Sequence, residues 1–191
     1  MRNFNLAPLG VATFLLAGCS GGQSAYDYAI PERICNIDVR ASYVKPLLPP
    51  GKAVRELSSN PVRPGASQSC SVMVDTREDL TVTFSRQIGE LDITEKAADK
   101  YIDLKRVSLG GGVTSAAVGD DGAIAWMKCT PKPGQPQYEF PKTKEGKYGH
   151  LVLEVHAGDG IRKLDNIEEW RAHIEQFLRA YIPELVKVWC V

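Results

Sequence analysis

The chain of 191 residues carries 23 basic and 23 acidic side chains, so its formal net charge at pH 7 is zero. A nucleic-acid-binding domain normally presents a basic surface, so this balance argues against nucleic acid as a partner. A chain of this length holds one ordinary hydrophobic core and does not require a second domain.

The first 18 residues have the pattern of an export signal. Arg2 supplies a positive charge, and residues 6–17 are almost entirely apolar, as in a secretory signal peptide. This apolar run is shorter than the roughly 20 residues that a membrane-spanning helix needs. We therefore predict a signal peptide over residues 1–18, which is absent from the mature protein.

The signal ends in Leu16-Ala17-Gly18-Cys19, which resembles the bacterial lipobox. In that motif a diacylglycerol is attached to the cysteine sulfur and a peptidase cuts before the cysteine. The resemblance implies that Cys19 carries the lipid and anchors the protein to the membrane, outside the cytoplasm. The alternative is an ordinary signal peptide that leaves Cys19 as a free thiol. Residues 19–27 are then the lipidated cysteine and a Gly/Ser-rich, flexible tether.

Four further cysteines follow the signal: Cys35, Cys70, Cys129 and Cys190. An even number in an exported protein indicates two disulfides, for which three pairings exist. We favour Cys35 with Cys70, which would join the first helix to an early strand, and Cys129 with Cys190, which would join the last helix to the sheet. No C-x-x-C pair is present, so zinc is disfavoured. We expect neither a metal nor a cofactor.

Residues 28–191 are expected to form one globular domain. Apolar residues at helical spacing predict a short helix over 38–48, and Pro49-Pro50-Gly51 would end it. The polar, proline-containing stretch that follows predicts a loop. A second helix would begin at Asp92 or Thr94 and run to about residue 103.

The clearest helix closes the chain. Asp165 and Glu168 form a pair like that of a capping box, and an apolar stripe continues to Tyr181. Pro183 is expected to kink or restart this helix, because proline lacks the N–H that a helix interior needs.

Alternation of apolar and polar residues indicates the strands. They are expected at 69–74, 80–85, 106–109, 113–118, 123–129 and 149–157. Hairpin turns are expected at 75–79 and at Asp120-Asp121-Gly122, and residues 130–148 form a long connection. This order predicts an α+β fold, in which a mostly antiparallel sheet is packed by a short N-terminal helix and a long C-terminal helix.

Two patterns suggest catalysis. Ser42-Tyr43-Val44-Lys45 matches the S-x-x-K of serine acyl enzymes, and Ser58-Ser59-Asn60 with Lys142-Thr143 resembles their companion motifs. The last motif lacks its glycine and the first two lie too close together, so we predict no catalytic residue here.

The second pattern is His150, Glu154 and His156, which alternate onto one face of the last strand. Glu154 and His156 could reach one divalent ion, but His150 lies about 13 Å from Glu154 at the rise of a strand. Two near ligands make a poor site, so the expectation is a solvated polar face.

Aromatic residues between lysines mark the long connection as a candidate contact surface. Its residues are Tyr138, Phe140, Lys142 and Lys144, which suit an envelope protein or an anionic polymer as partner. Alternatively, Tyr138 and Phe140 attach the connection to the core.

The segments "LAGC", "ICNIDVRASYVKPLLPPGK", "SCSVMVD" and the terminal "WC" together resemble actinobacterial two-disulfide lipoproteins of unknown function. Some of these are similar to the extracellular sensor domains of membrane serine/threonine kinases. The resemblance implies a sheet packed by helices, two disulfides and a cleft, and it carries no catalytic residue across. We expect a non-catalytic, membrane-anchored binding or sensor-like module. The alternatives are an envelope enzyme, either an acyl-serine or a metal-assisted hydrolase, and a structural accessory subunit of an envelope complex.

Overall fold

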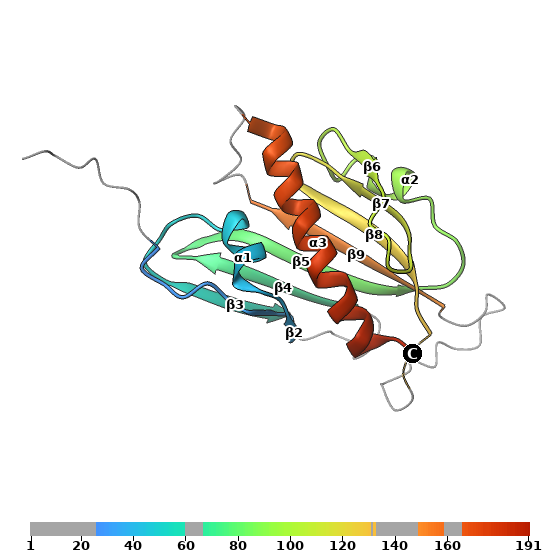
Figure 1. Cartoon of the computed structure of the whole chain (residues 1–191), viewed down its shortest axis with the longest axis horizontal. Coiled ribbons are helices and arrows are strands. Elements are labelled where there is room, and N and C mark those ends of the chain that lie inside the picture. The colour runs from blue at the N-terminus through green and yellow to red at the C-terminus, as the bar shows by residue number, and fades with distance from the viewer. Residues whose placement is uncertain (1–25, 60–66, 131, 133–148, 159–165) are drawn as a thin grey trace, which may run out of the picture.

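The computed structural model of the protein describes residues 26–59, 67–130, 132, 149–158 and 166–191. Its elements are β1 (Arg33–Ile34), β2 (Ile37–Asp38), α1 (Ala41–Val44), the 3-10 helix η1 (Lys45–Leu47), β3 (Val54–Ser59), β4 (Ser67–Val74), β5 (Arg77–Gln87), α2 (Ile93–Ala97), β6 (Lys105–Val107), β7 (Val113–Val118), β8 (Gly122–Lys128), β9 (His150–Ala157) and α3 (Ile167–Trp189). Figure 1 shows a broad sheet with α3 lying across one face. The predicted α+β fold is confirmed.

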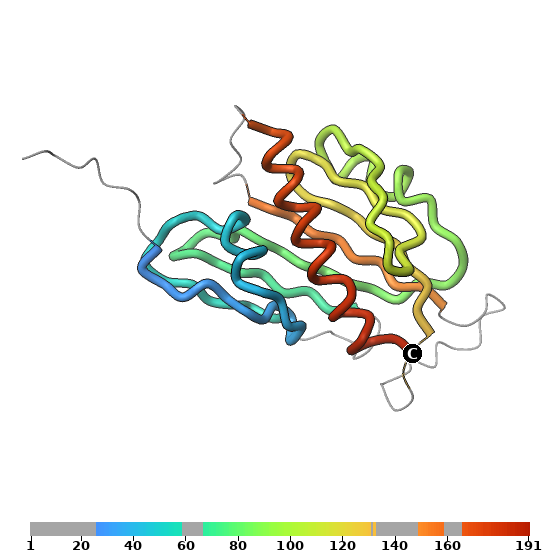
Figure 2. Tube along the Cα trace, viewed as in Figure 1, coloured from blue at the N-terminus to red at the C-terminus, as the bar shows by residue number. Residues whose placement is uncertain are grey.

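The main sheet has seven strands in the order β3-β4-β5-β9-β8-β7-β6, and every neighbouring pair is antiparallel. The late strand β9 lies between β5 and β8 and so joins the two halves of the sheet. β1 and β2 form a separate two-stranded hairpin. The chain trace in Figure 2 shows this early segment and α3 on the same side of the sheet.

The principal core lies between the sheet and α3. Phe177 and Tyr181 of α3 are fully buried, as are Val82 and Phe84 of β5 and Leu153 of β9. Burying a large apolar side chain stabilises the fold by roughly 1.5–3 kcal/mol. The apolar stripe of α3 therefore determines which face of the helix meets the sheet.

The helix α3 is continuous through Pro183, so of the two predicted effects, a kink or a restart, the restart does not occur. Buried residues precede and follow the proline, at Ile182 and Leu185, and their packing holds both turns in one helix. The helix begins after Asn166, whose side chain makes no capping hydrogen bond to the backbone. The predicted capping residue, Asp165, lies outside the described residues.

The opposite face of the sheet is partly covered by the segment that contains α2. Ile93, Ala97 and Tyr101 pack there in a second cluster with Ile124 and Trp126. The helix was expected to reach residue 103 but ends at Ala97. The chain then turns back over the sheet. Asp103 adopts a φ of 47°, which is incompatible with a right-handed helix.

The early segment also differs from its prediction. Helix was expected over residues 38–48, but Asp38 is paired with Arg33 in the β1–β2 hairpin, and α1 covers only Ala41–Val44. Pro46 in the following turn cannot donate a backbone hydrogen bond, and the chain continues as the 3-10 helix η1.

Strand β3 was predicted to be loop. It is an edge strand with one neighbour, β4, and Arg55, Glu56 and Leu57 are all exposed. No apolar alternation marks it, because little of it is buried.

Both favoured disulfides are present, Cys35–Cys70 and Cys129–Cys190, with Cα–Cα distances of 5.5 and 5.1 Å. The first joins the turn of the β1–β2 hairpin to β4, and the second joins the residue after β8 to the end of α3. The predicted tether over residues 19–27 is too long by two residues at its end. Tyr26 forms a β-bridge with Gly51, and the amide of Asp27 donates to the Gly51 carbonyl at 2.9 Å. These contacts place Tyr26 and Asp27 in the folded domain.

Candidate functional site

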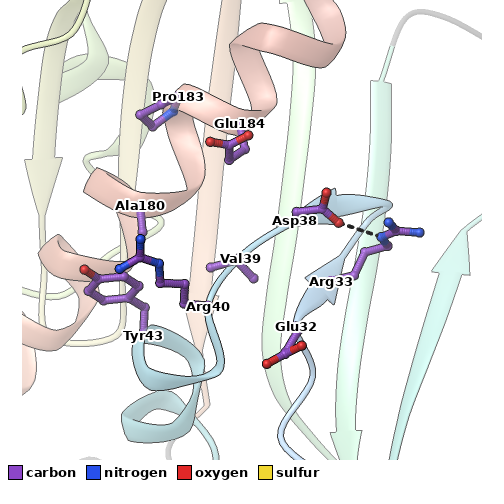
Figure 3. A pocket seen from close by; sticks show the side chains of 9 residues that line it. All are labelled: Glu32, Arg33, Asp38, Val39, Arg40, Tyr43, Ala180, Pro183 and Glu184. Carbon is purple, nitrogen blue, oxygen red and sulfur yellow. Dashed lines mark hydrogen bonds and ion pairs between the residues drawn. The ribbon is translucent and has the colours of Figure 1, made fainter.

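The candidate site is an open groove of about 880 Å³ between the β1–β2 hairpin, α1 and α3. Its lining residues are Glu32, Arg33, Asp38, Val39, Arg40, Tyr43, Ala180, Pro183 and Glu184. Figure 3 shows the early segment on one side of the groove and α3 on the other. This volume falls within the range of about 300–1,000 Å³ typical of small-molecule sites.

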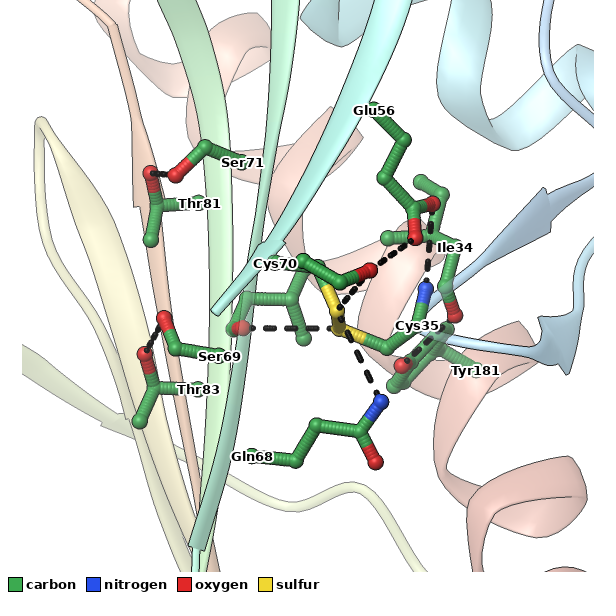
Figure 4. Close-up of a disulfide and its surroundings, with 12 residues drawn as sticks. Ile34, Cys35, Glu56, Gln68, Ser69, Cys70, Ser71, Thr81, Thr83 and Tyr181 are labelled. Atoms are coloured by element: carbon green, nitrogen blue, oxygen red, sulfur yellow. Dashed lines mark hydrogen bonds between the residues drawn. A yellow bond between two sulfur atoms is a disulfide. The ribbon is translucent and has the colours of Figure 1, made fainter. Parts of the chain in front are cut away.

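The hairpin wall of the groove is attached to the edge of the sheet by a disulfide and a hydrogen bond. Cys35 and Asn36 form its tight turn with φ values of 53° and 61°, and the Cys35–Cys70 disulfide joins this turn to the sheet (Figure 4). The amide of Cys35 donates to Glu56 Oε2 at 3.2 Å. These contacts fix the hairpin against β3 and β4.

Tyr181 connects the hairpin to the helical wall. Its buried phenol donates to the Ile34 carbonyl at 3.1 Å, as Figure 4 shows. Burial raises the pKa of Tyr181 well above its ordinary value, because the phenolate would lose its hydration. The phenol therefore remains a hydrogen-bond donor at neutral pH, and the hairpin and α3 keep a constant separation.

The α1 wall is positioned by the residues around the helix. Val39 and Val44 are buried in the principal core, which turns Arg40 and Tyr43 toward the groove. The amide of Tyr43 donates to the Arg40 carbonyl at 3.0 Å. One turn of chain therefore presents a guanidinium and a phenol at the same wall.

Ion pairs neutralise part of the groove. Arg33 Nε lies 2.9 Å from Asp38 Oδ1, and Glu184 Oε1 lies 2.6 Å from Lys187 Nζ. Arg40 and Glu32 have no ion-pair partner among the residues that the structure describes. Counting the described residues alone, the groove thus presents one positive and one negative group without an ion-pair partner.

The predicted serine motif is not assembled into a catalytic group within the described ranges. Ser42 is exposed, and the Lys45 ammonium lies over the Tyr26 ring, 5.0 Å from its centroid. Ser58 Oγ donates to Glu56 Oε1 at 3.0 Å. Asn60, Lys142 and Thr143 of the companion motifs lie outside the described residues.

The polar side chains of β9 do not simply face solvent as expected. Glu154 Oε1 lies 2.6 Å from Lys100 Nζ, and His156 stacks on Tyr101 with a centroid distance of 4.6 Å. His150 stacks on Trp126 at 4.5 Å. The segment after α2 folds over this face and supplies two of these partners, Lys100 and Tyr101. Within the described part of the chain, no group of three or more His, Cys, Asp or Glu side chains is placed to hold a metal ion.

The remaining predicted site residues, Cys19, Tyr138, Phe140, Lys142 and Lys144, lie outside the described residues. The sequence interpretation missed the groove residues Glu32, Arg40, Tyr43 and Glu184. Arg40 and Tyr43 are three residues apart at a predicted helix, which places them on one face. No local signal brings α3 opposite to them.

No helix of the described ranges has the length and apolar character needed to cross a membrane. Compared with known proteins, the chain matches no protein-family model, no curated protein and no solved structure.

Proposed function

We propose that the protein is a lipid-anchored, extracytoplasmic binding module that holds a ligand in the groove between the β1–β2 hairpin, α1 and α3. The observation that carries this proposal is the groove itself, since its volume suits a small ligand and one disulfide and one buried phenol hold its walls. Walls that are already in place reduce the entropy cost of binding. The resemblance to sensor-like lipoproteins points to the same kind of function.

The sequence and the disulfides support the proposed location. The signal pattern and the lipobox-like Cys19 favour export and lipid attachment. Two disulfides suit an oxidising compartment outside the cytoplasm. One acyl chain alone anchors weakly, and lipobox processing supplies the further chains that a stable anchor needs.

The tether joins the domain at one end of the sheet. Residues 20–25 separate Cys19 from Tyr26, so the attachment point lies within roughly 25 Å of the lipid. Tyr26 pairs with Gly51, at the end of the sheet that includes the β4–β5 turn. A second proposed contact, with an envelope protein or anionic polymer, would be made through Tyr138 and Phe140.

Anchoring is tested by the intact mass of the protein purified from its native host. The expected mature chain begins at Cys19 with a diacylglycerol thioether and an acylated amino group, and it partitions into detergent. Cys19→Ser should abolish both properties. An unmodified amino terminus, or partition of the native protein into the aqueous phase, would contradict the anchor.

Binding in the groove is tested by amide NMR spectra of the soluble domain, with low-molecular-weight envelope extract added. Peaks of groove residues should shift, and the double variant Arg40→Gln/Tyr43→Ala should lose these shifts. Lys128→Gln, an exposed change at the far end of β8, is the control and should keep them. Shifts spread evenly over the domain, or none at all, would contradict the proposed site.

A further inference from the structure

We infer that the groove takes an amphoteric ligand, a short peptide or peptide-like molecule with a free carboxylate and a free ammonium. The inference rests on the proposed function and specifies the class of ligand for the same groove. It follows from two charged side chains of the groove, Glu32 and Arg40, that have no ion-pair partner among the described residues.

The charges that line the groove exclude the simpler ligand classes. Three carboxylates and two guanidiniums line it, and one guanidinium, that of Arg33, is already paired with Asp38. A purely anionic ligand would meet Glu32, which has no ion-pair partner among the described residues, as well as Arg40, whereas Asp38 and Glu184 are already paired with Arg33 and Lys187. A purely cationic ligand would be repelled by the Arg40 guanidinium. A ligand with one group of each sign matches both unpaired side chains.

Arg40 and Tyr43 form the carboxylate end of the proposed site. A guanidinium can hold a carboxylate through two parallel hydrogen bonds. The phenol of Tyr43, which also lines the groove, has no hydrogen-bond partner in the described part of the chain and can donate a further bond. Both side chains come from the α1 side, so the ligand carboxylate lies at that wall (Figure 3).

The ammonium end is formed by Glu32. Glu32 is an exposed carboxylate at the start of the hairpin and lines the groove. It has no ion-pair partner among the residues that the structure describes, so it is available to an ammonium group of the ligand.

Small apolar residues complete the lining of the groove. Val39, Ala180 and Pro183 line the groove, and Val39 is almost completely buried. None of them is large or aromatic. The middle of the ligand is therefore expected to carry small side chains such as those of alanine, and a large aromatic side chain would not be matched by a deep pocket.

The experiment is an amide NMR titration of the soluble domain with trialanine. Three blocked forms are compared with it: acetylated at the amino end, amidated at the carboxyl end, and blocked at both ends. Shifts should centre on Val39, Arg40, Ala180 and Glu184. Exposed ion pairs contribute little each, so blocking one end should weaken binding about two- to fivefold, and blocking both ends should weaken it further.

Variants assign each end of the ligand. Arg40→Gln should remove the difference between trialanine and its amidated form, and Glu32→Gln should remove the difference between trialanine and its acetylated form. The controls are Lys128→Gln and Glu90→Gln, which change exposed charges away from the groove and should alter neither difference.

Equal affinity for the free and the doubly blocked peptide would overturn the amphoteric ligand, and so would the absence of groove shifts at about 10 mM trialanine. Either result leaves the proposed function standing if envelope extract still shifts the groove residues. Failure of both titrations would overturn the two proposals together.

Discussion

Arg171 of α3 donates its Nε hydrogen to Asp120 Oδ1 at 2.7 Å and so joins the long helix to the β7–β8 turn. The same guanidinium reaches Asp103 Oδ2 at 2.5 Å and Glu168 Oε1 at 2.9 Å. The Arg171 side chain is only 8% exposed. At the other end of the helix, the Cys129–Cys190 disulfide provides a covalent attachment. These two attachments hold the two ends of α3.

Replacing Arg171 should be costly. Arg171→Met keeps most of the apolar stem but leaves Asp120, whose side chain is 16% exposed, without its cation. We expect a loss of about 2 kcal/mol in the free energy of unfolding, measured by urea denaturation. Arg106→Met is the matched control, because Arg106 is 67% exposed, and it should cost well under 1 kcal/mol. Equal losses in the two variants would contradict a special role for Arg171.

The same cluster should make stability depend on pH in acid. Hydrogen bonding to Arg171 lowers the pKa of Asp103 below its ordinary value of 3.8. A carboxylate with a lowered pKa contributes its full stability when the pH is above its pKa in the unfolded state. This contribution is lost as the pH falls through its pKa in the folded state. The contribution of Asp103 should therefore disappear below pH 3.8.

Carbon-detected NMR titration of the Asp103 carboxyl group measures this shift. In Arg171→Met the pKa of Asp103 should return toward 3.8. Urea unfolding of Asp103→Asn should show a smaller fall in stability below that pH than the wild-type protein does. An Asp103 pKa that is unchanged by Arg171→Met would show that another group sets it.

Gly122, the first residue of β8, should tolerate no side chain. A Cβ at this position would lie 2.0 Å from the Val155 carbonyl oxygen and 2.6 Å from Cε1 of Tyr101. Gly122→Ala therefore forces the backbone of the central strand or the Tyr101 ring to move, at a cost of about 1–3 kcal/mol or more. Thermal unfolding measures the effect. Gly149→Ala is the control, since within the described ranges no further residue comes within 4 Å of its Cβ position, and the melting temperature of this variant should change little.

The two disulfides should differ in their effect on the groove. They close loops with sequence separations of 35 and 61 residues, and the chain-entropy model gives each about 4 kcal/mol. Cys35→Ala/Cys70→Ala should also release the hairpin wall and weaken groove binding. Cys129→Ala/Cys190→Ala should lower the free energy of unfolding by a similar amount and leave the hairpin attached. Urea denaturation and the peptide titration together distinguish the two effects, and an equal loss of binding in both variants would contradict the assignment.

The pairing of the cysteines and most strands could be predicted from the sequence. The strand expected at 80–85 lies within β5, the one at 113–118 coincides with β7, and the one at 149–157 is one residue longer than β9. Along β5, buried and half-buried residues alternate from Leu80 to Gln87. Such alternation is a local property of the chain. The edge strand β3 lacks it, since Arg55, Glu56 and Leu57 are exposed, and the strand exists because β4 supplies its hydrogen-bond partners.

By itself, the sequence determined the α+β class, most of the strands and the presence of two disulfides, because each depends on residue type or on periodicity along the chain. Among three possible pairings of the cysteines it favoured the one that forms. Only the tertiary structure decided that α2 stops at Ala97, that α3 continues through Pro183 and that Arg40 lies across a groove from Glu184. These outcomes depend on which surfaces pack against one another. Residues more than 140 positions apart in the chain carry no local signal of that proximity.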